Sequence, residues 1–289
     1  MRVPRRLVAV AILLGLLSTG LGKAVETLHG LTMSAPGRSG ESASLDPNRL
    51  ALVLGNSIYP DADSPLSQVT RDAAGLVNAL RKNGFLVDTV DNATRAEMTR
   101  AIDHLRARVH ANAIVLVYFG GYGVQSDGQN YLIPIDAKIW NEADVRQEGV
   151  SIDCVLSELE TSGARIRLVV IEASRRNPYE RRFRAYSHGL APIQASGTRL
   201  ILSSAAPGQI VDDSGEPHSQ LMSALLTQMN SSEGIEGVIK NSQTTLAATT
   251  QGQQVSAESS TLTESVNPWP AGSGAPVSTV GSAASDRRE

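Results

Sequence analysis

The stretch IRLVVIEASRRNPY, residues 166–179, joins a short apolar run to a polar loop. The run at 166–171 has the length and the aliphatic composition of a strand that is buried on both faces. Similar runs recur along the chain, and helix-patterned segments lie between most of them. Because crossover helices cover parallel sheets, this alternation predicts an α/β fold with a mostly parallel sheet of about six strands and helices on both faces. The other strands are expected at 49–55, 85–90, 113–119 and 199–204, and the helices at 73–80, 95–109, 152–160 and 221–229.

Two loops follow predicted strands, and a site is expected there because ligands collect at the carboxyl ends of parallel strands. The first loop is GGYG at 120–123, followed by a predicted hairpin at 124–134. The second is EASRRNP at 172–178. The glycine loop has neither the lysine of a phosphate-binding loop nor a helix directly after it, which disfavours nucleotide binding. A tight exit from the strand is the simpler interpretation of its glycines.

Composition narrows the possible functions. The chain has 289 residues, a net charge of −3 and 19% charged residues, which excludes a grossly basic nucleic-acid binder. Its single cysteine, Cys154, excludes an intramolecular disulfide framework and any multi-cysteine zinc or iron–sulfur site. We expect Cys154 to be a small buried side chain on the helix at 152–160. His104 and His110 are expected at the surface without metal-ligand neighbours, and no cofactor is implied.

The two ends of the chain differ in composition from this core. Arginines precede the apolar run at 7–17 and small residues follow it, a pattern typical of an export signal over 1–24, with an uncleaved membrane anchor as the alternative. Residues 25–47 have the composition of a disordered linker, and a low-complexity tail is expected over 261–289. We therefore expect one folded domain at 48–260 in an exported protein, periplasmic or extracellular, with no integral membrane domain once the signal is cleaved.

Four blocks of sequence carry a resemblance to a known family. Their order and spacing resemble the caspase-like peptidases, particularly the prokaryotic orthocaspases and the metacaspases. The resemblance implies the caspase–hemoglobinase fold over 48–260. The blocks are LALVLGNSIY at 50–59 with Asp72 and Ala73 behind it, the strand at 115–119 with GQNYLIPIDA at 128–137, VVIEASRRNPY at 169–179 with GLA at 189–191, and a closing stretch at 252–260 with Ser256 in place of the family's proline.

The same resemblance places two substitutions at the catalytic dyad. Tyr122 occupies the position of the family's histidine, and Ser174 occupies that of its cysteine. A serine hydroxyl needs a positioned base, and tyrosine, with an ordinary pKa of about 10, is a poor one at neutral pH. Three possibilities for an active site stay open, namely Ser174 with another base such as His188, Cys154 as nucleophile, and non-proteolytic chemistry by the tyrosine–serine pair, for which the sequence names no substrate.

The resemblance also implies a recognition pocket. In the orthocaspases and metacaspases two acidic residues hold the Arg or Lys that precedes the cleaved bond, and these positions match Asp72 and Glu172, with Gly120 beside them. The alternative is that Asp72 only caps or solvates the start of its helix and that Glu172 ends a strand facing water.

The loop after Ser174 is rich in arginine. A solvated loop, an anion-binding loop, or an arginine that folds back into the acidic pocket are the interpretations that the pattern allows. These arginines are Arg175, Arg176, Arg181, Arg182 and Arg184.

The sequence thus predicts a catalytically inactive caspase-like pseudopeptidase that acts as a peptide-binding, decoy or regulatory module. Its expected partner is a basic peptide or an active caspase-like relative, without nucleic acid. One alternative is an active endopeptidase that cleaves after Arg or Lys with Ser174 as nucleophile. Another is a structural module that assembles through a sheet edge, including a possible homodimer.

Overall fold

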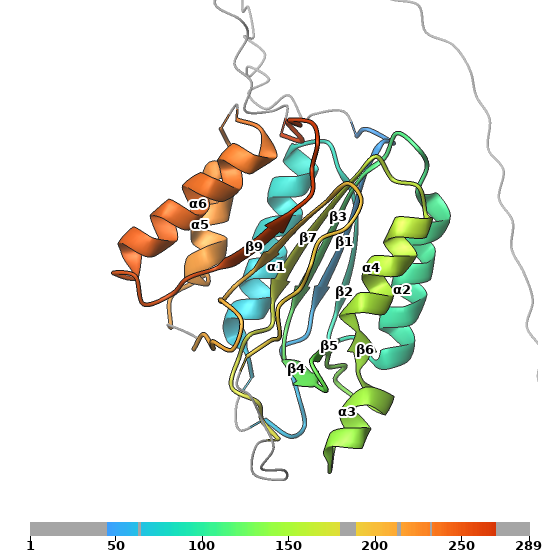
Figure 1. The fold of residues 1–289 in the computed structure, drawn as a ribbon, viewed down its shortest axis with the longest axis vertical. Coiled ribbons are helices and arrows are strands. Elements are labelled where there is room, and N and C mark those ends of the chain that lie inside the picture. The colour runs from blue at the N-terminus through green and yellow to red at the C-terminus, as the bar shows by residue number, and fades with distance from the viewer. Residues whose placement is uncertain (1–44, 63–64, 180–188, 213–214, 232, 270–289) are drawn as a thin grey trace, which may run out of the picture. The chain divides into compact units, whose positions relative to one another are not determined.

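The computed structural model describes residues 45–62, 65–179, 189–212, 215–231 and 233–269, and its main feature is a six-stranded sheet (Figure 1). The strand order is β2-β1-β3-β7-β8-β9, and all neighbouring strands are parallel except β8 and β9. The predicted mostly parallel six-stranded sheet is therefore confirmed. The strands are β1 (Arg49–Gly55), β2 (Leu86–Asp91), β3 (Ile114–Gly120), β7 (Ile166–Glu172), β8 (Arg199–Ser203) and β9 (Ala257–Ser260).

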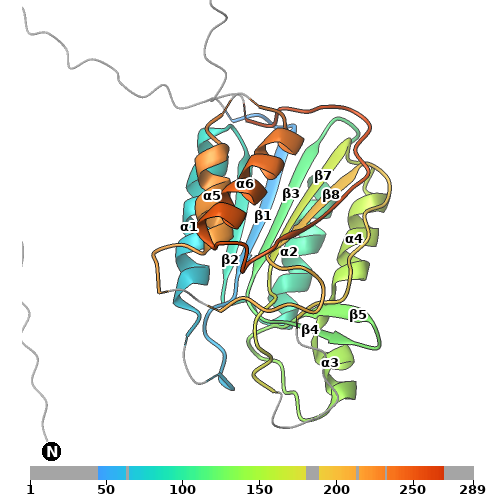
Figure 2. The same ribbon diagram turned by 60° about the vertical axis from the view of Figure 1, so that its left-hand side comes forward.

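Helices cover both faces of this sheet, as predicted. In Figures 1 and 2, one face carries α1 (Ser67–Lys82), α5 (Gln220–Gln228) and α6 (Ile235–Thr249), and the other carries α2 (Arg95–Arg108) and α4 (Ile152–Thr161). Successive side chains of a strand point to opposite faces, so β1 contributes to both cores. Ala51 and Val53 pack under the first set of helices, whereas Leu50, Leu52 and Leu54 pack under the second.

Helix α2 shows how local sequence produces these elements. Met98, Ile102 and Leu105 recur at helical spacing and are all buried. Thr94 accepts a hydrogen bond from the Glu97 amide while the Glu97 side chain accepts one from the Thr94 amide, a capping box that fixes where the helix begins. The predicted helix at 95–109 is thus confirmed to within one residue.

A small second sheet follows the glycine loop. It consists of β4 (Gly123–Ser126), β5 (Gln129–Leu132) and β6 (Val150–Ser151), with α3 (Glu142–Glu148) between β5 and β6. Asp127 and Gly128 connect β4 and β5 with positive φ angles of 51° and 74°, as a two-residue hairpin turn requires. The predicted hairpin is confirmed, and the glycine loop leads into a strand, not into a phosphate-binding helix.

Packing continues beyond residue 260, where the tail was expected to begin. Val266 and Trp269 lie in the core, and the ring centroids of Trp269 and Phe85 are 6.1 Å apart. The Arg49 guanidinium donates to the Pro268 carbonyl at 2.7 Å. Ordered contacts therefore extend to Trp269. The expected signal at 1–24, most of the linker and the rest of the tail lie outside the described residues, and within the described part of the chain no helix has both the length and the apolarity to cross a membrane.

Candidate functional site

Strands β3 and β7 bring the two predicted loops together. Gly120 at the end of β3 is in register with Glu172 at the end of β7. Beyond the strands, the Gly121 amide donates to the Glu172 carbonyl at 3.2 Å and the Gly123 amide donates to the Ala173 carbonyl at 2.9 Å. The expectation that these loops meet at one edge of the sheet is confirmed.

Ser174 lies inside this junction with a side chain that is 1% exposed. Its Oγ has no hydrogen-bond partner among the residues that the structure describes, and its carbonyl accepts from the Val211 amide at 2.7 Å. A serine nucleophile needs a base within hydrogen-bond reach. The proposed alternative base, His188, lies outside the described residues.

The side chain of Tyr122 packs on another aromatic ring. The centroids of Tyr122 and Tyr59 are 4.8 Å apart in an edge-on arrangement. The Tyr59 hydroxyl accepts from the Tyr122 amide at 3.1 Å and donates to the Ile133 carbonyl at 2.9 Å. A Cβ at Gly121 would lie 2.5 Å from that hydroxyl, which explains why this loop position is glycine. Burial raises the pKa of Tyr59 far above its ordinary value, so its hydroxyl stays protonated.

The two acidic residues of the expected pocket converge, and both are buried. Asp72 lies on α1 with no exposed surface, and Glu172 is 2% exposed. Ser219, just before α5, binds both: its amide donates to Asp72 Oδ1 at 3.1 Å, and its hydroxyl donates to Glu172 Oε1 at 2.5 Å. The alternative of a solvated helix start and a strand end that faces water is therefore wrong, because α5 and its preceding loop cover both groups.

Burial controls the protonation of this pair. Burial and, second to it, the negative charge of Asp72 together raise the pKa of Glu172 to about 7. Burial also raises the pKa of Asp72, against the hydrogen bonds from His218 and Ser219 that lower it. Two carboxylates that are kept from water thus favour holding a proton.

Gly120 has a steric role beside this pair. The Tyr118 hydroxyl donates to Glu172 Oε2 at 2.9 Å. A Cβ on Gly120 would lie 2.6 Å from that hydroxyl oxygen. Glycine at this position leaves room for the Tyr118–Glu172 hydrogen bond.

Arg175 is the arginine of the basic loop that lies against the acidic pair. It is 8% exposed, and its guanidinium donates to the main-chain carbonyls of Gly121, at 3.1 Å, and Glu172. Its positive charge lowers the pKa of both Asp72 and Glu172, opposing the effect of burial. The cavity that Glu172, Arg175 and Ser219 line has a volume of only about 20 Å³, close to the space of one water molecule. Of the other arginines, Arg176 is exposed, and Arg181, Arg182 and Arg184 lie outside the described residues.

Comparison with known protein families identifies the family of the chain. A family model described as "Caspase domain" matches residues 48–267, most of the chain. The chain belongs to the caspase-domain family. Two curated relatives are similar to it, the mucosa-associated lymphoid tissue lymphoma translocation protein 1 of human and its mouse homolog, each 30% identical over 96 residues. The aligned part covers 32% of this chain and 11% of each relative, so the chain matches only about a tenth of the length of these relatives.

Cys154 of this caspase domain is exposed, so its expected burial is wrong. The buried positions of α4 are Ile152, Val155, Leu156 and Leu159, which turn the face that carries residue 154 toward solvent. Cys154 instead lines a groove of about 280 Å³ with Arg95 and Tyr131, and none of Tyr122, Ser174, Asp72 and Glu172 lines that groove. His104 and His110 are exposed, as predicted.

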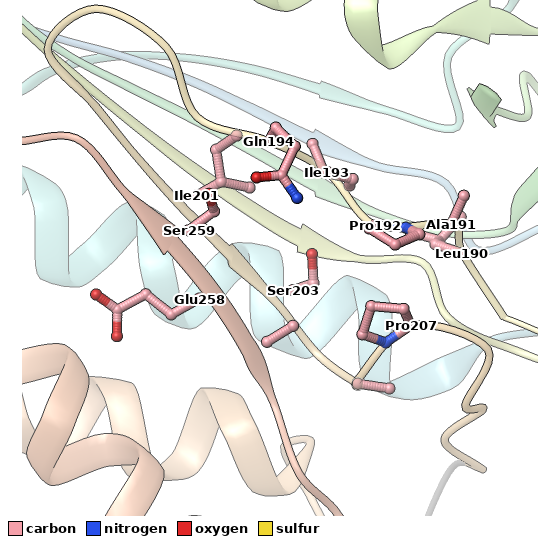
Figure 3. Close-up of a pocket in the computed structure, with 12 residues that line it drawn as sticks. Leu190, Ala191, Pro192, Ile193, Gln194, Ile201, Ser203, Pro207, Glu258 and Ser259 are labelled. Carbon is pink, nitrogen blue, oxygen red and sulfur yellow. The ribbon is translucent and has the colours of Figure 1, made fainter. Parts of the chain in front are cut away.

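A second groove, of about 250 Å³, lies beside β8 and is larger than the acidic cavity (Figure 3). Three segments line it: residues 190–194, residues 201–207 at β8 and beyond, and residues 257–259 of β9. Its wall contains neither Tyr122 nor Ser174. The groove therefore adjoins the site through the segment after β8 without including either of these two residues.

Proposed function

We propose that this caspase domain is a pseudopeptidase, in which Tyr122 and Ser174 stand at the positions of the family's histidine and cysteine. The observation that supports this most directly is the buried Ser174 Oγ without a hydrogen-bonded base among the described residues. The ring of Tyr122 supports it as well, since it packs on Tyr59. Loss of a nucleophile or base in comparable peptidases lowers turnover by about six orders of magnitude, or about 8 kcal/mol of barrier.

The purified protein is expected to show no turnover of reporter peptides that end in Arg or Lys, and no labelling of Ser174 by a fluorophosphonate probe. Both assays monitor an activated serine, and among the residues that the structure describes no base is hydrogen-bonded to the Ser174 Oγ. The Ser174→Ala variant is the matched control and should give the same background. Turnover or labelling that Ser174→Ala abolishes would instead establish a hydrolase that uses Ser174.

An active caspase-like relative is the proposed partner, in preference to a basic peptide. The acidic pair is engaged by Ser219, and a cavity of about 20 Å³ is too small for a guanidinium group. A fluorescent peptide ending in Arg should therefore show no saturable change in anisotropy. Saturable binding that Asp72→Asn removes would favour the basic peptide as partner.

A further inference from the structure

Described residues after β8 lie against the site and contact it at several points. We call residues 204–212 and 215–219 the cover segment. The Gly208 amide donates to the Leu190 carbonyl at 2.9 Å, and the Val211 amide donates to the Ser174 carbonyl at 2.7 Å. The cover segment therefore lies directly against the loop that carries Ser174.

The far end of the cover segment is held by α1. The Gln68 side chain donates to the Glu216 carbonyl at 2.9 Å, and the Arg71 guanidinium donates to the carbonyls of Glu216, at 3.1 Å, and Pro217. His218 Nδ1 lies 2.8 Å from Asp72 Oδ1. With the two hydrogen bonds of Ser219 to Asp72 and Glu172, these contacts make the carboxylate pair the buried centre of the attachment.

We propose that the Asp72–Glu172 pair is a proton-dependent lock that holds the cover segment against Ser174. In this role the pair binds a proton and the chain's own Ser219. The proposal goes beyond the pseudopeptidase function, because it concerns the position of the cover segment and holds whether or not Ser174 reacts.

The sign of the pH dependence follows from burial. Displacement of the cover segment removes Ser219 and His218 from the carboxylates and admits water, so both groups return toward their ordinary pKa values. The closed form holds its proton more tightly, since the pKa of Glu172 there is about 7 instead of 4.5. Closure is therefore most stable below about pH 4.5, weakens as the pH rises toward about 7, and changes little above it.

Charged and titratable groups from several elements face the pair. Arg175, after β7, lowers both pKa values, and Tyr118 on β3 keeps its own proton because burial and Glu172 raise its pKa. His218 precedes α5 and faces Asp72, and Asp212 of the cover segment lines the small cavity with Glu172.

Amide hydrogen exchange across this pH range tests the lock in the intact protein. After correction for intrinsic exchange, the protection of the Val211 and Ser219 amides should fall on the order of 100-fold between about pH 4.5 and about pH 7. The amides of β3 report global unfolding, so their protection should not show this fall with pH. Protection of Val211 and Ser219 that does not depend on pH, or that changes in parallel with β3, would overturn the proposal.

Three variants separate the lock from general stability. Glu172→Gln cannot titrate and should flatten the pH dependence. Asp72→Asn removes the charge that raises the pKa of Glu172, so the transition should move to lower pH. Asp103→Asn, a carboxylate on the exposed side of α2, is the matched control and should behave like the wild type. An unchanged transition in both Glu172→Gln and Asp72→Asn would contradict the proposal, and the second variant keeps the test decisive if the first does not fold.

Discussion

Replacement of Trp269 by alanine is expected to lower the free energy of unfolding by about 3–5 kcal/mol. Trp269 is 1% exposed, packs against Phe85 and belongs to the core beneath α1, α5 and α6. Its removal leaves a large cavity where residues 268 and 269 lie beside β1, since Arg49 also binds the Pro268 carbonyl. Urea denaturation followed by circular dichroism measures the change.

The chain supplies a matched control, because its other tryptophan is exposed. Trp140 is 68% exposed, so Trp140→Ala should change the free energy of unfolding by less than about 0.5 kcal/mol. Equal effects of the two substitutions would contradict the packing of residues 261–269. A chain that ends at residue 260 should lose at least as much stability as Trp269→Ala, because it loses the same contacts and Val266 as well.

The sequence predicted the buried strands and amphipathic helices because their patterns are local. The central strands are continuous apolar runs, and α2 repeats its apolar residues at helical spacing. Strand β9, with the sequence AESS, was missed because it is short, polar and half exposed at the sheet edge. Helix α6, with the sequence IEGVIKNSQTTLAAT, was missed because it is rich in glycine, asparagine, serine and threonine, which have low helix propensity. For these two elements tertiary packing outweighs the local signal.

The candidate site, like the fold, could be predicted from the sequence only in part. The meeting of the two loops follows from parallel strand order, so it could be predicted. The engagement of the acidic pair by Ser219 could not, since Ser219 lies 47 residues from Glu172 and 147 residues from Asp72 and no local pattern marks it. The burial of Cys154 was wrongly predicted from its residue type, whereas the helix face decides it.

Replacement of Gly189 by alanine should lower the free energy of unfolding by about 2–5 kcal/mol. Gly189 has a φ of +74°, and a Cβ there would lie 2.1 Å from the carbonyl oxygen of Gln209 in the cover segment. A backbone atom cannot yield as a flexible side chain does, so the added methyl must push the cover segment away from its position. The Val211 amide, which donates to the Ser174 carbonyl, should then lose protection from hydrogen exchange.

The variant Gly208→Ala serves as a control, because it carries the energetic cost of a positive φ without the steric contact that Gly189→Ala makes with Gln209. Gly208 lies in the same segment with a φ of +75°, but no heavy atom of the described residues, apart from its own and those of its two chain neighbours, lies within 4 Å of the position that a Cβ would take. Its replacement should therefore cost only about 1–2 kcal/mol, the ordinary penalty for a left-handed alanine. Equal losses of stability in the two variants, or an unchanged Val211 amide in Gly189→Ala, would show that the close approach of Gly189 and Gln209 does not fix the cover segment over the site.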